Sequence, residues 1–106
     1  MFGRQVTLKL KANSATELNR IATDEILPIL RKQKGFRDET TFIAPERSEA
    51  IVNSFWDTKA DAEAYGHTAY SEVLKTLSNV IDGTPTVKNF EFASSTLQQA
   101  AAWKLA

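Results

Sequence analysis

The residues best suited to acid–base chemistry lie together in the middle of the chain, where His67 stands between Tyr65 and Tyr70. Imidazole exchanges a proton near neutral pH, so His67 is a candidate catalytic base. At these spacings one phenolic hydroxyl can come close to the imidazole, which makes both tyrosines candidate ligand-binding residues. The alternatives are structural: His67 would bond a free backbone group at a helix end, and Tyr70 would pack in the core.

A second group of candidates closes an apolar stretch: Asn53, Phe55 and Trp56, followed at once by an acidic, Ala-rich segment that begins near Thr58. An aromatic residue at such a junction lies at the rim of a sheet, where a pocket can form. Phe55 and Trp56 are therefore candidate ligand-binding residues, although a core position is the common fate of a tryptophan. Asn53 is a candidate catalytic residue, because a buried amide needs hydrogen-bond partners that a ligand or a neighbouring chain would supply.

The composition argues against several kinds of chemistry. The chain has no cysteine and one histidine, and no Glu-x-x-His pairing, so we predict neither a metal site nor a thiol nucleophile. Its 13 basic and 13 acidic residues alternate along the chain, which argues against nucleic acid or an anionic membrane as partner. The start resembles no signal peptide and no stretch approaches the roughly 18 apolar residues of a membrane span, so the cytoplasm is the expected location.

Hydrophobic periodicity supplies the elements that must position these residues. Alternation predicts strands over residues 6–11, 36–44, 50–56 and 87–93, and helical spacing fills 14–34 and 58–81. This β-α-β-β-α-β order is the ferredoxin-like α+β arrangement, a four-stranded antiparallel sheet with both helices on one face. We expect residues 1–94 to form one domain and 95–106 to form a C-terminal helical extension.

Local signals refine the two helical segments. Ser14 and Glu17 match the capping box that begins many helices, and Pro28 predicts a kink because it lacks an N–H group. In the second segment Thr58 with Asp61 predicts a cap at the start. A glycine followed by Thr68 then predicts a break, with Thr68 capping a second piece that extends to Ile81.

Two helices cover one side of a sheet, so the other side must meet solvent or a partner. Both alternating sets of the third strand carry apolar bulk, namely Val52 and Trp56 on one side and Ile51 and Phe55 on the other. In the second strand the alternation places Ile43 opposite in phase to Phe36 and Phe42. We therefore predict a homodimer in which two sheets pack face to face as an α/β barrel, with the extension clasping the partner. The alternative is a monomer whose extension covers its own sheet.

Several segments carry a family likeness: Ile26–Arg31, Lys34–Arg37, Phe55–Asp57, Ala60–Tyr65 and Gly83–Val87. Through them the chain resembles the antibiotic biosynthesis monooxygenase-like family of dimeric α/β-barrel proteins over roughly residues 4–94. The resemblance implies a fold, and it implies a group of activities that includes cofactor-independent quinone-forming oxygenases, quinol oxygenases and haem-degrading enzymes.

The oxygenases of that family imply a site that needs no metal or flavin, because a deprotonated phenol can itself pass an electron to oxygen. Such a site needs a dry apolar pocket, a polar group for the enolate oxygen and a base. The resemblance assigns these roles near Asn53 and Trp56, which an ideal strand would place on opposite faces. The haem-degrading branch is similar through Trp56 and His67, but its first-strand asparagine is missing.

Two functions follow as alternatives. One is a cofactor-independent monooxygenase acting on a small aromatic phenol or quinol. The other is a non-catalytic homodimer that binds a small ligand or acts as an accessory protein. A pocket around Trp56 that is large and lined by titratable groups would favour the enzyme, and a packed interior would favour the binding protein.

Overall fold

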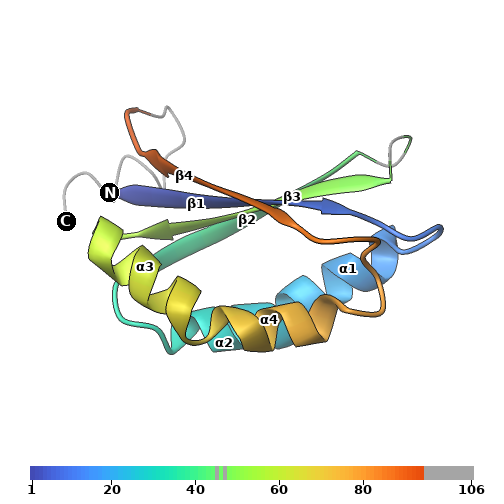
Figure 1. Cartoon of the computed structure of the whole chain (residues 1–106), viewed down its shortest axis with the longest axis horizontal. Coiled ribbons are helices and arrows are strands. Elements are labelled where there is room, and N and C mark those ends of the chain that lie inside the picture. Colours follow the sequence, from blue (N-terminus) through green and yellow to red (C-terminus); the bar gives the residue numbers. More distant parts are fainter. Residues whose placement is uncertain (45, 47, 95–106) are drawn as a thin grey trace.

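The computed structural model describes residues 1–44, 46 and 48–94. The elements follow one another in this order: β1 (Phe2–Lys9), α1 (Ala15–Ile21), a π-helical turn η1 (Ala22–Ile26), α2 (Leu27–Arg31), β2 (Phe36–Ala44), β3 (Glu49–Trp56), α3 (Lys59–His67), α4 (Tyr70–Leu77) and β4 (Thr86–Glu91). All helices lie on one side of the sheet (Figure 1).

The four strands form one sheet in the order β2-β3-β1-β4, and the three neighbouring pairs are antiparallel. This confirms the predicted α+β ferredoxin-like architecture. The predicted helical extension over residues 95–106, and its clasp on a partner, fall outside the described residues. Among the residues that the structure describes, no helix has the length and apolar character needed to cross a membrane.

The first helical segment changes its hydrogen-bonding pattern just before Pro28. The N–H of Leu27 donates to the carbonyl of Ala22, five residues back, which is the bond of a π turn. Proline offers no N–H, and its ring crowds the carbonyl of Asp24 if the helix stays regular. The predicted disturbance at Pro28 therefore takes the form of one wide turn placed directly before it.

One of the three predicted helix caps forms. The capping box at α1 is wrong: Ser14 makes no side-chain cap, and the carboxylate of Glu17 pairs with Arg20 in the same helix instead. At α3 the hydroxyl of Thr58 accepts a hydrogen bond from the backbone N–H of Asp61 at 3.1 Å, as predicted. The carboxylate of Glu17 is held by the guanidinium of Arg20, so it does not complete the capping box. The hydroxyl of Thr58 is bonded to the backbone N–H that it was expected to cap.

The predicted break in the second helical segment is confirmed, but Thr68 acts differently from the prediction. Its hydroxyl donates to the carbonyl of Ala64 at 2.7 Å, so Thr68 closes α3, and α4 starts at Tyr70 without a side-chain cap. Ile81 lies beyond the end of α4, where it pairs with Leu10 in an isolated β-bridge.

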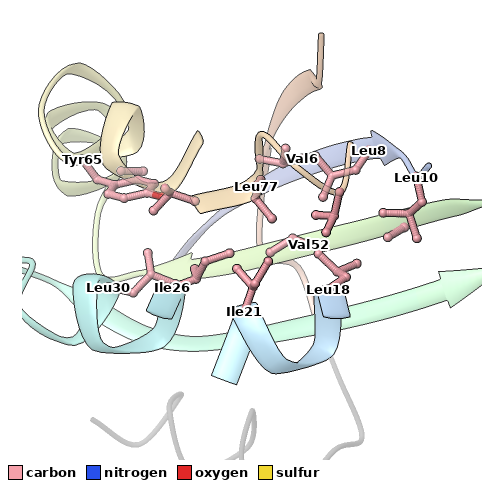
Figure 2. Packing of buried hydrophobic residues seen from close by; sticks show 14 of the residues in the cluster. Val6, Leu8, Leu10, Leu18, Ile21, Ile26, Leu30, Val52, Tyr65 and Leu77 are labelled. Atoms are coloured by element: carbon pink, nitrogen blue, oxygen red, sulfur yellow. The ribbon is translucent and has the colours of Figure 1, made fainter. Parts of the chain in front are cut away.

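The core fills the layer between the sheet and the helices. Figure 2 shows Val6, Leu8 and Val52 of the sheet meeting Ile21, Ile26 and Leu30 of the helices in this layer. A register shift between Phe36 and Asp38 marks a bulge in β2. Because a bulge reverses the alternation, Phe36 and Ile43 both pack against the core while Phe42 is 63% exposed. The predicted opposition of Ile43 and Phe36 is therefore wrong.

Candidate functional site

An aromatic cluster lies under the helix-facing side of the sheet and consists of Phe36, Trp56, Tyr65 and Tyr70. Trp56, at the end of β3, is 0% exposed. Its ring stacks on Tyr65 with centroids 4.9 Å apart and meets the edge of Phe36 at 5.6 Å. Tyr65 in turn contacts Tyr70 edge-on at 6.0 Å. The structure thus brings together three of the predicted ligand-binding residues.

A charged residue that the sequence reasoning missed adjoins this cluster. Arg4, on β1, places its guanidinium carbon 4.5 Å from the ring centre of Tyr70 and 5.7 Å from that of Tyr65. These are cation–π distances. The alternation along the first strand could have revealed this position. Arg4 is two residues before Val6, so both side chains point to the side of the sheet that faces the helices. The predicted strand begins at Val6, whereas β1 begins at Phe2.

The environment of the two tyrosines keeps them as neutral phenols. Burial raises the pKa of Tyr65 well above its ordinary value, against the opposing charge of Arg4. Burial also raises the pKa of Tyr70, and there too the charge of Arg4 and a hydrogen-bonding interaction with it act in the opposite direction. At neutral pH both hydroxyls can therefore donate hydrogen bonds.

A glycine makes room for the guanidinium. Gly66 lies inside α3, where glycine costs about 1 kcal/mol relative to alanine. A Cβ atom built at Gly66 would lie 2.9 Å from the Nη1 atom of Arg4. The bare helix backbone therefore allows Arg4 to approach the last turn of α3, whose carbonyls favour a cation.

Polar residues form a row across the sheet at the level of Arg4. Arg4 is paired with Asn89 on β4 and with Ser54 on β3, and Ser54 is paired with Glu39 on β2. Glu39 accepts a hydrogen bond from the hydroxyl of Thr41, and partial burial raises the pKa of its carboxyl despite that bond. Acidic, hydroxyl and cationic groups thus share one level of the helix-facing side.

The space left among these side chains is small. A cavity of about 20 Å³ lies between the sheet and the helices. Its lining includes Ser54, Tyr65 and Tyr70 together with core aliphatic residues. A volume of this size accommodates about one water molecule. The site as it stands is closed, and a substrate can bind only if a side chain moves.

The remaining sequence candidates lie elsewhere. His67 is exposed at the last position of α3. Asn53 and Phe55 lie on the helix-free side of β3, opposite Trp56, and the amide of Asn53 donates to the hydroxyl of Thr40 at 3.2 Å. The strand is regular here, so the spacing of three between Asn53 and Trp56 separates them. Their predicted catalytic and binding roles stay predictions.

The helix-free side of the sheet carries an open hollow of about 270 Å³. Gly3 is paired with Phe55 and with Phe90, so the missing side chain leaves a gap between two rings. Asn53 and Gln5 contribute amides to the same hollow. Phe90 is 50% exposed and Phe42, farther along this side, is 63% exposed. Within residues 1–44, 46 and 48–94, no group of three or more His, Cys, Asp or Glu residues could hold a metal ion.

Comparisons with known proteins show which solved structures share this architecture. No family model matches the chain, and no curated protein matches it significantly. Solved structures do match. A monooxygenase of Streptomyces coelicolor in complex with the ligand nanaomycin D superimposes with a TM-score of 0.74 at 19% identity, covering 91% of this chain and 90% of that one.

A protein of unknown function from Nitrosomonas europaea gives a TM-score of 0.72 at 15% identity and covers 91% of this chain and 92% of its own. A proposed antibiotic biosynthesis monooxygenase from Caulobacter crescentus gives 0.69 at 16% identity, covering 88% and 90% of the two chains. The chain therefore has the fold of antibiotic biosynthesis monooxygenase-like proteins. Identities this low concern the fold and leave the activity open.

Proposed function

We propose that this protein is a cofactor-independent monooxygenase that oxidises a small aromatic phenol or quinol beneath the helix-facing side of its sheet. The observation that carries the proposal is the pair of neutral phenols, the buried Tyr65 and the half-buried Tyr70, in an aromatic cluster with Trp56. Support comes from the shared fold with a monooxygenase whose structure holds the ligand nanaomycin D.

The chemistry requires little from the protein. An ionised phenol passes one electron to oxygen, and the radical pair then combines at an activated carbon. If that carbon is a ring methylene, one oxygen atom becomes the new carbonyl oxygen and the other leaves as water with the two methylene hydrogens. Tyr65 and Tyr70 would donate hydrogen bonds to the ionised oxygen, and exclusion of water would strengthen those bonds.

Substrate binding in this proposal begins with a movement of Tyr70. The cavity of about 20 Å³ is far too small for an aromatic ring, so a lining residue must yield. Tyr70 is half-buried and is the first residue of α4, directly after the break that separates α3 from α4. Its ring can therefore swing outward without disturbing a long helix.

Oxygen consumption with simple hydroquinones tests the proposal. We expect the wild type to exceed autoxidation in buffer, and Tyr65→Phe and Tyr70→Phe each to lower kcat by about a hundredfold or more, the usual scale for a lost oxyanion donor. His67→Ala and Asn53→Ala test the two residues first chosen from the sequence. Consumption at the buffer rate for the wild type would remove the enzymatic function for this substrate class.

A second function is favoured by one observation, the nearly filled interior around Trp56. Neither a non-catalytic ligand-binding protein nor an accessory protein needs a pocket that encloses its ligand and excludes water for a reaction with oxygen. In this function a hydroquinone or related aromatic compound binds without any oxygen uptake. Calorimetric binding measured beside the oxygen assay distinguishes the two functions.

Under either function we propose a homodimer formed through the helix-free side of the sheet. Phe42 and Phe90 are both at least half exposed there, and an apolar surface of this kind marks an interface. The partner proposed is a second copy of the chain, because the same side carries both protruding rings and the hollow at Gly3 that can receive one. The cytoplasmic location stays a prediction.

A further inference from the structure

We propose that Arg4 is a binding residue for an aromatic ligand that carries two neighbouring oxygens, at least one of them ionised, such as an ortho-hydroxyaryl carboxylate or ketone. This inference rests on the proposed function and names the substrate class of the same site. It is argued from the hydrogen bonding of Arg4, from its placement and from its surroundings.

The guanidinium of Arg4 has an unused donor. Its Nε atom is buried and has no hydrogen-bond partner among the described residues. No carboxylate forms an ion pair with Arg4 in the part of the chain that the structure describes. A buried donor without a partner destabilises the folded chain, and more so when it is charged, so native structures rarely keep one without a reason.

The chain holds the guanidinium in place instead of leaving it to reach solvent. The rings of Tyr65 and Tyr70 lie 5.7 and 4.5 Å from its central carbon. Gly66 removes the side chain that would collide with Nη1. These contacts engage the face and one end of the guanidinium, and they leave the Nε–H free to point at an acceptor.

The geometry of arginine sets the class of acceptor. The guanidinium is planar and presents Nε–H and a neighbouring N–H as two parallel donors, which match two oxygens held in one plane. A single hydroxyl, as in phenol, would satisfy one of them. The rings of Tyr65 and Tyr70, which lie beside the guanidinium, offer apolar surface to the body of the ligand.

Salicylate is a suitable probe, because it joins a carboxylate and an ortho hydroxyl on one ring. Calorimetric titration of the wild-type protein should detect salicylate, with phenol at least tenfold weaker. Arg4→Lys keeps the charge but loses the planar pair of donors, so we expect it to bind salicylate at least tenfold more weakly. Arg31→Met, at the exposed end of α2, is the matched control and should bind as the wild type does.

The outcomes separate this inference from the proposed function. Salicylate binding that depends on Arg4, together with no oxygen uptake from any hydroquinone, supports the inference and excludes the enzymatic function for this substrate class. Equal salicylate affinity in wild type, Arg4→Lys and Arg4→Met overturns the inference, as does the absence of any salicylate binding by the wild type. Circular dichroism and urea unfolding establish that each variant is folded, and Arg4→Lys serves if Arg4→Met is not.

Discussion

The indole Nε1–H of Trp56 donates a hydrogen bond to the hydroxyl oxygen of Ser54, 2.9 Å away and two residues earlier on the same strand. Both residues are buried on the helix-facing side of β3. A tryptophan in a core needs an acceptor for its one donor, and here the strand that carries the ring also supplies the acceptor.

Replacing Ser54 should therefore lower the stability of the folded chain. Ser54→Ala leaves the buried indole donor without a partner, and we expect the free energy of unfolding to fall by about 1–3 kcal/mol. Urea unfolding followed by tryptophan fluorescence measures the change. Ser78→Ala removes an exposed hydroxyl at the end of α4 and should change stability by less than about 0.5 kcal/mol. Equal effects of the two substitutions would contradict this explanation.

Gly66 and Arg4 should be energetically coupled. In an Arg4→Met background Gly66→Ala should stabilise the protein by about 0.5–1 kcal/mol, because alanine is the better helix former. In the wild-type background the new Cβ meets Nη1 at 2.9 Å, so the gain should shrink or reverse. A double-mutant cycle of unfolding free energies measures the coupling.

An exposed position on the neighbouring helix provides the control for this cycle. Ser71 is exposed on α4. Ser71→Ala should give the same stability change whether residue 4 is arginine or methionine. If Gly66→Ala also gives the same change in both backgrounds, the close approach of Arg4 to α3 does not explain the glycine.

Stability should depend on pH through Glu39. Burial raises the pKa of this carboxyl in the folded chain above its unfolded value, so the folded state binds the proton more tightly. Its contribution is therefore most favourable below the unfolded pKa of about 4.5 and is lost as the pH rises through the folded pKa. Glu39→Gln keeps an acceptor for Thr41 and should remove this decline.

Urea unfolding of both proteins between pH 4 and pH 7, a range that covers the ordinary titration of a carboxyl group, measures the effect. We expect Glu39→Gln to gain stability relative to the wild type as the pH rises. Glu63→Gln, on the exposed part of α3, should show a much smaller difference. Parallel pH profiles for wild type and Glu39→Gln would show that the carboxyl carries no such cost.

The proposed dimer makes a prediction about mass. Sedimentation of the wild type at micromolar concentration should give about twice the mass of one chain. Phe42→Glu places a charge on the helix-free side of β2 and should shift the equilibrium to single chains. Ser71→Glu, on the exposed surface of α4, should leave the mass unchanged. A wild type that sediments as one chain would contradict the proposal.

The succession of strands and helices along the chain follows from periodicity, because half-buried strands and amphipathic helices repeat at different spacings. Local details, such as a bulge in a strand or the partner of a charged side chain, are harder to predict from the sequence. The bulge near Phe36 reverses one alternation, and the carboxylate of Glu17 prefers Arg20 to the helix cap. The grouping of Trp56, Tyr65 and Tyr70 needs the fold, since it depends on how α3 crosses the sheet. Arg4 lies before the predicted first strand, so its place beside this cluster becomes evident only because β1 begins at Phe2.

The break after His67 divides the cover over the aromatic cluster into α3, with 9 residues, and α4, with 8. A single helix of that combined length could uncover Arg4 only by tilting as a whole. Two short helices separated by a break can move independently, so one can move away from the sheet while the other stays packed on the core. Amide hydrogen exchange should therefore be faster near residues 68–70 than within α3 or α4, and ligand entry would cost few backbone hydrogen bonds.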